Sequence, residues 1–391
     1  MVSNVCIECN LNICPLQSFI KCIYCNQNVC TGCKIDHINK HTRFKRMKPL
    51  GIANVGFSCY MSVALQCLGA CSILSNYIIN NSFDDTLLNE YKGFVNSLFN
   101  EETNEPYIPA NIKKEVGLID EEFKDSKQKD CYQFMSTLLN ELNTRLSDEE
   151  NQTFFQSRAL GRSISLDEAI AEGISKALGV NSSLTSNLFT VMAANIIRCK
   201  KCSNKRIKLE SSFSLSLPIP SKKSPLLSDC LMEYLNVQQL TGNNLINCAV
   251  CNEKVEGESY MQLVHLPPYL LLYFKKQKLK KLNVTEKTQV HVEYPTAIDF
   301  TELMANSNST YILDSISKRP PKYRLLGIVF HMGNIDEGHY TCLIRRCNAW
   351  YYCDDSKVKA VSKEEFVKSN NEVILLYERE GIDSIISKES C

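Results

Sequence analysis

Cysteine is the residue that most constrains this chain: twenty of its 391 residues are cysteine, and half of these stand in Cys-x-x-Cys pairs. Residues 1–10 lack the apolar segment of a secretory signal peptide, and the longest clear apolar run, Tyr269–Phe274, is far shorter than a membrane span. We therefore expect a protein of the cytoplasm or nucleus, with no membrane partner. In a reducing compartment, cysteines serve as metal ligands, nucleophiles or small buried hydrophobic residues rather than as disulfides.

The charge of the chain is nearly balanced, with 44 Lys and Arg against 43 Asp and Glu, and 44% of the residues are hydrophobic. This composition is typical of a globular protein of two or three domains, and it excludes a globally basic nucleic-acid binder. The basic stretch Lys40–Lys48 is the one segment that could contact nucleic acid, and a solvated linker is the simpler interpretation of it.

Two Cys-x-x-Cys turns in the second half of the chain predict a structural zinc site. Each turn can bring two thiolates to one tetrahedral zinc ion, and two turns make a closed site with no open position for water. The alternative is two unrelated cysteine pairs. The four predicted ligands are Cys199, Cys202, Cys248 and Cys251.

The first 41 residues are dense in cysteine and end in two histidines that are four residues apart. They offer the ligands that two tetrahedral zinc ions require, and so short a segment needs metal binding to supply its folding free energy. Cys14 could replace one of these ligands, and free cysteines in a tail are the alternative. The predicted ligands are Cys6, Cys9, Cys22, Cys25, Cys30, Cys33, His37 and His41.

A glycine-containing loop, Gly51–Ser58, runs into a segment whose apolar residues have helical spacing, and Cys59 stands where that helix begins. A helix N-terminus stabilises anions, so we expect it to lower the pKa of this thiol and to favour the reactive thiolate. Asn54, on the same loop, could direct its side-chain amide at a developing oxyanion. A buried cysteine that caps a helix is the alternative.

The general base for such a nucleophile must be a histidine, and His339 has the most suitable setting. It precedes a predicted strand, Tyr340–Ile344, and a second predicted strand, Trp350–Cys353, is followed by Asp354 and Asp355. An antiparallel hairpin of these strands would place His339 opposite the end of the second strand and so beside a carboxylate. The other histidines of this half of the chain lack such a partner in the sequence, and we interpret them as structural: His265, His291 and His331.

The hydrophobic patterns predict an α+β protein with a helical region followed by a β-rich region. Helical spacing covers Tyr60–Leu74 and Cys131–Leu146, and the polar residues 147–187 separate these helices from the strands. We expect a zinc module at 1–41, a basic linker at 42–49, a main domain at 50–380 and a tail at 381–391. The predicted strands are Phe213–Leu217, Tyr269–Phe274, Tyr323–Phe330, Tyr340–Ile344, Trp350–Cys353 and Val373–Tyr377.

Three motifs together resemble the ubiquitin-specific protease family of deubiquitinases. Gly51–Gln66 looks like the cysteine box of the family, Tyr323–Arg345 with Trp350–Val358 like its histidine box, and Gln128–Phe134 like its internal Gln-Gln-Asp motif. The likeness spans about Leu50–Glu380, with the motifs in the right order. It implies a papain-like fold with a helical thumb, a β-rich palm and fingers that hold zinc through the paired Cys-x-x-Cys turns.

The resemblance implies a thiol-dependent ubiquitinyl hydrolase that cleaves after the terminal glycine of ubiquitin. Its residue roles would be Cys59 as nucleophile, His339 as base, Asp354 as third member, Asn54 as oxyanion donor and Asp355 as an assisting neighbour. The substrate side, which includes contacts to the arginine-bearing ubiquitin tail, would comprise Gln128, Asp130, Gln133, Gly338 and Tyr340. Gln133 replaces the glutamate of the family, which removes one charge-assisted contact, and no departure removes a reacting group.

The N-terminal segment resembles the ubiquitin-binding zinc finger of the family and also fits a B-box-like module. It is short, and the arginine that usually follows its Cys-Gly pair is absent, so we favour docking of a partner protein over binding of the ubiquitin tail. A structural cap on the main domain is the third option. For the whole chain, the rival functions are a zinc-dependent ubiquitin receptor without activity and a protease for another ubiquitin-like modifier.

Overall fold

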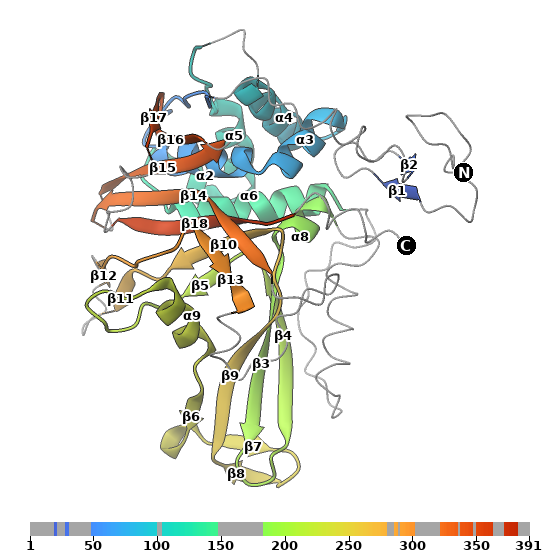
Figure 1. The fold of residues 1–391 in the computed structure, drawn as a ribbon, viewed down its shortest axis with the longest axis vertical. Helices are drawn as coiled ribbons and strands as arrows, with labels where there is room; N and C mark the ends of the chain where they lie inside the picture. Colours follow the sequence, from blue (N-terminus) through green and yellow to red (C-terminus); the bar gives the residue numbers. More distant parts are fainter. Residues whose placement is uncertain are drawn as a thin grey trace.

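The computed structural model describes residues 19–21, 28–30, 48–99, 104–147, 183–279, 285–287, 290–301, 321–334, 337–346, 349–362 and 371–381. Within them, a helical lobe lies on a large central sheet, and a long arm of paired strands leaves the sheet on the side away from the helices (Figure 1). The predicted N-terminal zinc ligands lie outside the described residues, apart from the backbone of Cys30 in strand β2 (Asn28–Cys30), which pairs with β1 (Phe19–Lys21). The zinc module and the domain boundaries therefore stay predictions.

The helical lobe is organised around α2 (Cys59–Ala70), which is buried along its whole length. Three rings fix the start of this helix: Tyr60, Phe123 and Phe134 have centroids 5.2, 5.5 and 5.9 Å apart. The predicted helix over Cys131–Leu146 is confirmed as α6. The other helices of the lobe are α3 (Ser72–Asn80), α4 (Thr86–Phe99), α5 (Ala110–Ile119), the 3₁₀ turn η1 (Glu121–Phe123), α6 (Cys131–Arg145) and α8 (Leu184–Phe189).

The prediction of one helix over Tyr60–Leu74 is wrong at its C-terminal end. The chain leaves helical geometry at Cys71, whose ψ is 93°, and α3 then runs at 86° to α2. The bend allows Ile73 and Leu74 to remain fully buried in the same core as α2. Among the described helices, none alone is long and apolar enough to cross a membrane; only α2 and α3 taken together across this bend reach that length and composition.

The central sheet has eight strands in the order β17-β16-β15-β14-β18-β10-β5, with β13 paired to β14. Side chains alternate between its two faces: Cys342 and Ile344 of β15 pack with the helical lobe, whereas Leu343 packs into a second core on the other face. All six predicted strands overlap strands of this sheet. Their bounds are β5 (Leu215–Leu217), β10 (Tyr269–Phe274), β13 (Ala297–Asp299), β14 (Lys322–Gly333), β15 (Gly338–Arg346), β16 (Ala349–Asp354), β17 (Lys357–Val361) and β18 (Glu372–Arg379).

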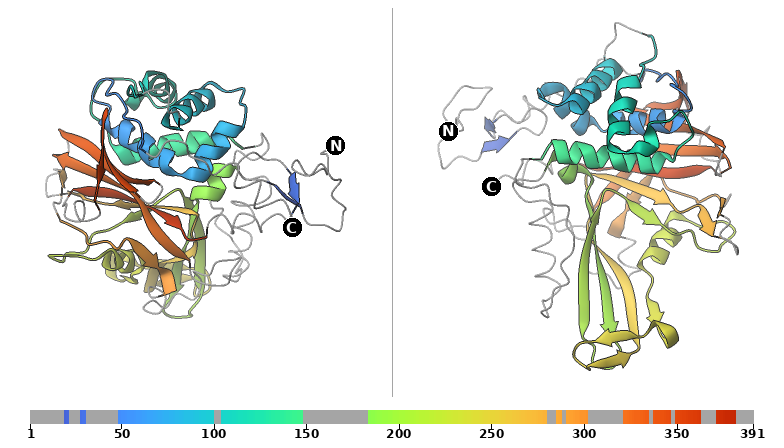
Figure 2. Two further views of the ribbon diagram at one scale, coloured as in Figure 1. Left: turned by 45° about the horizontal axis from the view of Figure 1, so that its top comes forward. Right: turned by 180° about the vertical axis from the view of Figure 1, so that it is seen from behind.

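The arm is a four-stranded antiparallel sheet in the order β4-β3-β9-β6, and the small β7–β8 hairpin lies at its tip (Figures 1 and 2). Its own hydrophobic cluster is small and includes the fully buried Ile196. The remaining elements are β3 (Val191–Cys199), β4 (Lys205–Ser212), α9 (Leu227–Leu235), β6 (Gln238–Leu240), η3 (Gly242–Asn244), β7 (Ile246–Cys248), β8 (Glu253–Val255), β9 (Gly257–His265), β11 (Gln277–Leu279) and β12 (Thr285–Lys287).

Candidate active site and four-cysteine cluster

The loop that precedes α2 is held by hydrogen bonds that fix the side chain of Asn54. Its Oδ1 accepts the N–H of Ser58 at 2.9 Å, and its Nδ2 donates to Asp355 Oδ2 at 2.8 Å. The N–H of Val55 donates to Ser58 Oγ at 2.8 Å, which closes the loop on itself. The Asn54 amide is therefore held from both ends, next to the residue where the helix begins.

Cys59 is the first residue of α2 and is only 4% exposed. Burial raises the pKa of its thiol, and the negative charge of Asp355 adds to this, whereas backbone N–H groups, chiefly that of Tyr340, lower it. The predicted net lowering of this pKa is therefore wrong. The N–H groups at the helix start act in the expected direction, but desolvation outweighs them, so the thiol needs a base to remove its proton.

His339 and Asp354 meet where two neighbouring strands place them, His339 near the start of β15 and Asp354 at the end of β16. Cross-strand pairing of Cys342 with Cys353 sets this register. The His339 Nε2 and the Asp354 Oδ1 lie 2.7 Å apart, and both side chains are 39% exposed. The predicted hairpin is thus confirmed. Because the carboxylate engages Nε2, Nδ1 is the ring nitrogen left to exchange a proton with a thiol.

Asp355 follows Asp354 but contacts a different element. Its φ of 49° turns the chain, its Oδ2 accepts the Asn54 amide, and its carbonyl oxygen accepts the N–H of Ile52 at 2.9 Å. The buried Asp355 Oδ1 has no hydrogen-bond partner among the described residues. The ligating atoms of His339, Asp354 and Asp355 all lie within 4.8 Å of one another. Asp354 thus holds the imidazole, whereas Asp355 ties the end of β16 to the Asn54 loop.

The segment before α6 adjoins the strand that carries His339. Gln128 Oε1 accepts the N–H of Gly338 at 2.6 Å, and Asp130 Oδ1 caps α6 by accepting the N–H of Gln133 at 2.9 Å. Burial raises the pKa of Asp130, whereas hydrogen bonds oppose this, one of them to the side chain of Tyr340. The structure therefore brings all five predicted substrate-side residues together next to His339.

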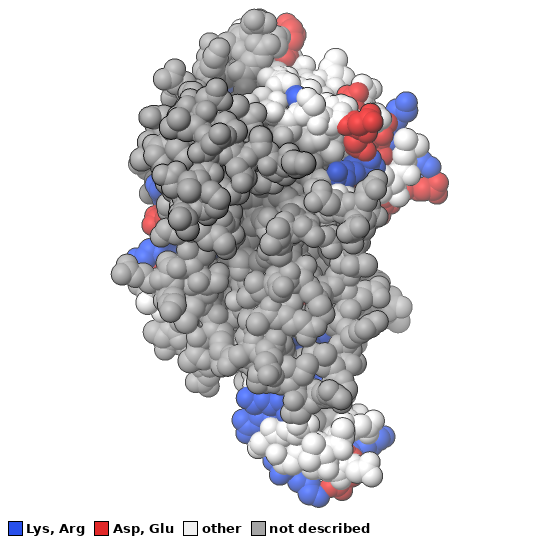
Figure 3. Space-filling view, turned by 90° about the vertical axis from the view of Figure 1, so that its right-hand side faces the viewer, with Lys and Arg blue, Asp and Glu red and all other residues white. Residues whose placement is uncertain are grey.

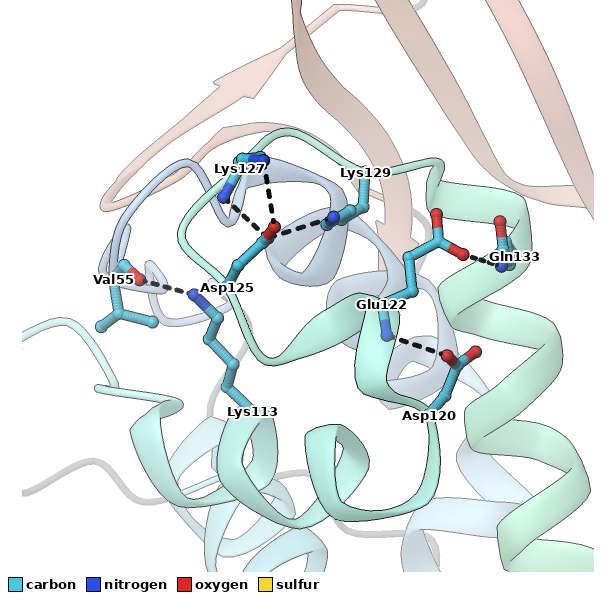
Figure 4. Close-up of polar contacts among 8 residues, drawn as sticks. All are labelled: Val55, Lys113, Asp120, Glu122, Asp125, Lys127, Lys129 and Gln133. Atoms are coloured by element: carbon cyan, nitrogen blue, oxygen red, sulfur yellow. Dashed lines mark hydrogen bonds and ion pairs between the residues drawn. The ribbon is translucent and has the colours of Figure 1, made fainter.

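Sequence reasoning missed Glu122, which lies in η1 and accepts a hydrogen bond from the side chain of Gln133 (Figure 4). The two residues are 11 positions apart, on different elements. No motif or periodicity marks this pair, because the contact depends on how η1 packs against α6.

The four predicted ligands on the arm converge at its tip, where their sulfur atoms lie within 4.8 Å of one another. Cys199 and Cys251 sulfurs are 3.9 Å apart, and those of Cys202 and Cys248 are 3.6 Å apart. Four thiolates around zinc at bonds of about 2.3 Å have sulfurs about 3.8 Å apart in a regular tetrahedron, so this donor set fits the ion. In each turn the N–H of the second cysteine approaches the sulfur of the first, at 3.5 and 3.4 Å.

Basic side chains gather around this tip (Figure 3). Lys201 follows Cys199 by two residues and pairs with Glu253, and Lys200 lies 3.5 Å from Glu256. Positive charge beside four thiolates is electrostatically favourable, because a zinc ion neutralises only part of their charge.

His291 has an acidic partner that the sequence did not reveal. Its Nδ1 lies 3.4 Å from Oε2 of the fully buried Glu372, whose Oε1 accepts from Lys276 at 3.2 Å and from the N–H of Val292 at 2.8 Å. The sequence did not reveal this carboxylate, but the structural role predicted for His291 agrees with its place in a buried network. Val292 belongs to the core on the face of the sheet away from the helices, so this network is apart from the helical face that carries Cys59.

Comparisons with known proteins point consistently to one family. The pattern of the family described as ubiquitin carboxyl-terminal hydrolase matches residues 50–377, so the chain belongs to this family. A ubiquitin carboxyl-terminal hydrolase 4 of Eremothecium gossypii is 27% identical over an alignment of 365 positions, which covers 84% of this chain and 42% of that protein. For ubiquitin carboxyl-terminal hydrolase 5 of Saccharomyces cerevisiae the identity is 26%, over 84% of this chain and 44% of the relative.

The chain thus spans less than half the length of these curated relatives. Among solved structures, the SAGA Ubp8/Sgf11/Sus1/Sgf73 DUB module bound to ubiquitin aldehyde matches with a TM-score of 0.64 and 18% identity. The match covers 97% of this chain and 90% of the other. At this identity the likeness establishes a shared fold, which mixes helices and sheet.

Proposed function

We propose that the chain is a deubiquitinating cysteine protease, which hydrolyses the thioester, peptide or isopeptide bond after the C-terminal glycine of ubiquitin. The observation that carries the proposal is the 2.7 Å contact of His339 with Asp354, in a family member whose Cys59 begins a buried helix. The names of the relatives and the ubiquitin aldehyde bound by the structural neighbour support the choice of substrate.

In the first half of the reaction, Cys59 attacks the carbonyl carbon of the terminal glycine. Because burial holds the thiol protonated, His339 removes its proton as the sulfur–carbon bond forms. The Asn54 amide and the N–H groups at the start of α2 stabilise the oxyanion, and Asp355 keeps Asn54 in place. The imidazolium then gives its proton to the leaving amine, which departs as the carbon–nitrogen bond breaks.

In the second half, a water molecule attacks the thioester. His339 accepts a proton from this water, and the Asn54 amide again stabilises the oxyanion. The carbon–sulfur bond breaks, the thiolate of Cys59 regains its proton from the imidazolium, and ubiquitin leaves with a free carboxylate. Throughout the cycle, Asp354 orients the imidazole and stabilises its charged form.

The helical lobe, the central sheet and the arm would then be the thumb, palm and fingers of a papain-like protease. The cluster of Cys199, Cys202, Cys248 and Cys251 would hold one structural zinc ion, which joins the two sides of the arm tip. Such an ion takes no part in the chemistry, since four sulfur ligands leave no position for water.

Residues 1–41 would form a zinc module that docks a partner protein, in the cytoplasm or nucleus. Deletion of this segment should leave hydrolysis of a small ubiquitin–fluorophore substrate nearly unchanged, while it impairs action on a native conjugate or recruitment to a complex. Loss of folding in residues 51–380, or loss of small-substrate hydrolysis, would refute the docking role. If the full-length chain and the chain without residues 1–41 are both inactive alone, their activities are compared after reconstitution with the partner.

Hydrolysis of ubiquitin–fluorophore by the wild-type protein and the His339→Ala variant tests the function directly. We expect turnover by the wild type and little or none by the variant, because the variant lacks the base proposed to take the Cys59 proton. The same assay with fluorophore substrates of other ubiquitin-like modifiers measures how strongly the protein prefers ubiquitin. Binding of ubiquitin without turnover would instead favour an inactive receptor, and preferred turnover of another modifier would change the assigned substrate.

A further inference from the structure

A strained and exposed aromatic residue lies two positions before the proposed nucleophile. Phe57 has a φ of 49° and is 59% exposed. This left-handed backbone conformation is rare for a bulky residue, whereas glycine and asparagine adopt it more readily. Neither burial nor backbone preference therefore accounts for a phenylalanine here, and a strained residue next to a reacting group is a candidate for a functional contact.

The backbone on both sides of Phe57 is held in place. On one side, Lys113 donates a hydrogen bond to the carbonyl oxygen of Val55 at 3.3 Å (Figure 4). On the other side, the N–H of Ser58 donates to Asn54 Oδ1 at 2.9 Å. Among the residues that the structure describes, Phe57 belongs to none of the hydrophobic clusters. A fixed loop thus presents an aromatic ring to solvent beside the reacting groups.

The proposed reaction places substrate atoms close to this ring. Consecutive Cα atoms are about 3.8 Å apart, so the Cα of Phe57 is at most about 7.6 Å from that of Cys59. During the attack, the carbonyl carbon of the terminal glycine lies at the Cys59 sulfur, and the leaving nitrogen lies next to His339. The glycine has no side chain. The first apolar group that the substrate presents beyond the scissile bond is therefore the four-carbon stem of the acceptor lysine.

We propose that Phe57 is a specificity-determining residue, which packs against the aliphatic stem of the lysine to which ubiquitin is joined. The inference rests on the proposed function for the reaction and for the position of the substrate. In an isopeptide bond the lysine nitrogen belongs to an uncharged amide, so the methylene groups next to it carry no charge toward the ring. Removing these groups from water against an apolar ring is favourable.

An exposed ring without a role is the competing explanation, since single apolar side chains are common on protein surfaces. Phe57→Ala removes the ring but keeps a residue with a Cβ atom in the left-handed conformation, and Phe57→Leu keeps an apolar side chain. Leu118→Ala is the matched control, because Leu118 is a 64% exposed apolar residue of the same lobe, in the last turn of α5. Phe57→Asn replaces Phe57→Ala if circular dichroism shows that the alanine variant does not fold.

The test measures kcat/KM on ubiquitin–peptide conjugates that differ only in the length of the stem at the isopeptide bond. The series runs from lysine through ornithine and diaminobutyrate to diaminopropionate, and each step removes one methylene group. The ratio of the lysine value to the diaminopropionate value is compared between proteins, which cancels the effect of stem length on the basicity of the amine. A distorted loop would slow all conjugates alike and leave this ratio unchanged.

For Phe57→Ala we expect this ratio to be about five- to tenfold lower than for the wild type, because the methylene groups lose their apolar contact. Phe57→Leu should lower the ratio by about twofold or less, since an apolar side chain remains. Leu118→Ala should have the wild-type ratio. A wild-type ratio in Phe57→Ala, with or without a uniform loss of turnover, would overturn the inference and leave the proposed function standing.

Binding of the same conjugates to the Cys59→Ala protein, with and without Phe57→Ala, separates this inference from the proposed hydrolysis. If the wild type is inactive but Phe57→Ala weakens binding of the lysine conjugate more than that of the diaminopropionate conjugate, the inference stands and the hydrolysis fails. If the wild type is inactive and both conjugates lose affinity equally or not at all, or if neither conjugate binds, both are contradicted.

Discussion

Cys59 and the four-cysteine cluster at the arm tip differ in what holds their sulfur atoms in place. Cys59 is 4% exposed within the larger core, and the groups around it come from distant parts of the chain, as when Asn54 contacts Asp355 across 301 positions. At the tip, Cys202 is exposed, and the hydrophobic cluster of the arm, which includes Ile196, is small. Packing and long-range hydrogen bonds position Cys59, the proposed nucleophile, whereas the geometry of the tip would depend on the proposed zinc ion.

The largest expected loss of turnover comes from replacing Asp354, the carboxylate proposed to orient the base. Asp354→Ala should lower kcat by about 10⁴-fold, because the imidazole loses the group that sets its orientation and stabilises its charge. Steady-state kinetics on ubiquitin–fluorophore gives the value, with circular dichroism to confirm that the variant is folded. A near-normal Asp354→Ala together with an inactive Asp355→Ala would reverse the two roles.

The second effect concerns the oxyanion donor. Asn54→Ala should lower kcat by about 10²–10³-fold, as for removal of one oxyanion-hole donor. Asp355→Ala should approach this loss, because Asp355 acts through Asn54. The double variant should then be little worse than Asn54→Ala alone. Fully additive losses would show that Asp355 acts independently of Asn54.

At the arm tip, Cys248→Ser should remove about one zinc ion per chain and lower the thermal midpoint, while Cys59 keeps its reactivity toward a small alkylating reagent. Elemental analysis and thermal unfolding measure the two quantities. Val250→Ser is the matched control, since Val250 lies in the same turn, is 65% exposed and offers no ligand. A Cys248→Ser protein with unchanged zinc and stability would eliminate the tip as a metal site.

The smallest expected effect is on the pH dependence of Cys59 alkylation, followed by peptide mass spectrometry. Only the thiolate reacts, and burial raises the pKa of Cys59, so its rate should still increase at pH values where an exposed thiol has already levelled off. The negative charge of Asp355 also raises this pKa. Asp355→Asn removes that charge and should therefore move the profile to lower pH. Movement to higher pH would contradict the electrostatic account.

Features set by short-range patterns were predictable from the sequence. The convergence of the four arm cysteines was predicted from their Cys-x-x-Cys spacing. An antiparallel hairpin predicted a carboxylate beside His339, and the family resemblance chose Asp354 over Asp355. A hairpin sets the geometry at His339, and each Cys-x-x-Cys turn places one pair of cysteines, whereas the approach of the two turns depends on how the strands of the arm pair.

Features set by packing were not predictable. The bend at Cys71 depends on keeping two apolar segments in one core, and the pKa of Cys59 depends on how deeply neighbouring elements bury it. The contact of Glu122 with Gln133 arises because η1 is anchored through Phe123 against α2 and α6. Apolar spacing reports which residues are buried, but not which distant surfaces meet.

The most direct test of the central claim is reaction with ubiquitin that carries a C-terminal electrophile, measured by intact mass and peptide mapping. The wild-type protein should gain the mass of one ubiquitin, attached at Cys59, and the Cys59→Ala protein should gain none, although nineteen other cysteines remain in the chain. An unlabelled wild type, or full labelling of Cys59→Ala, would contradict the assignment of Cys59 as the nucleophile.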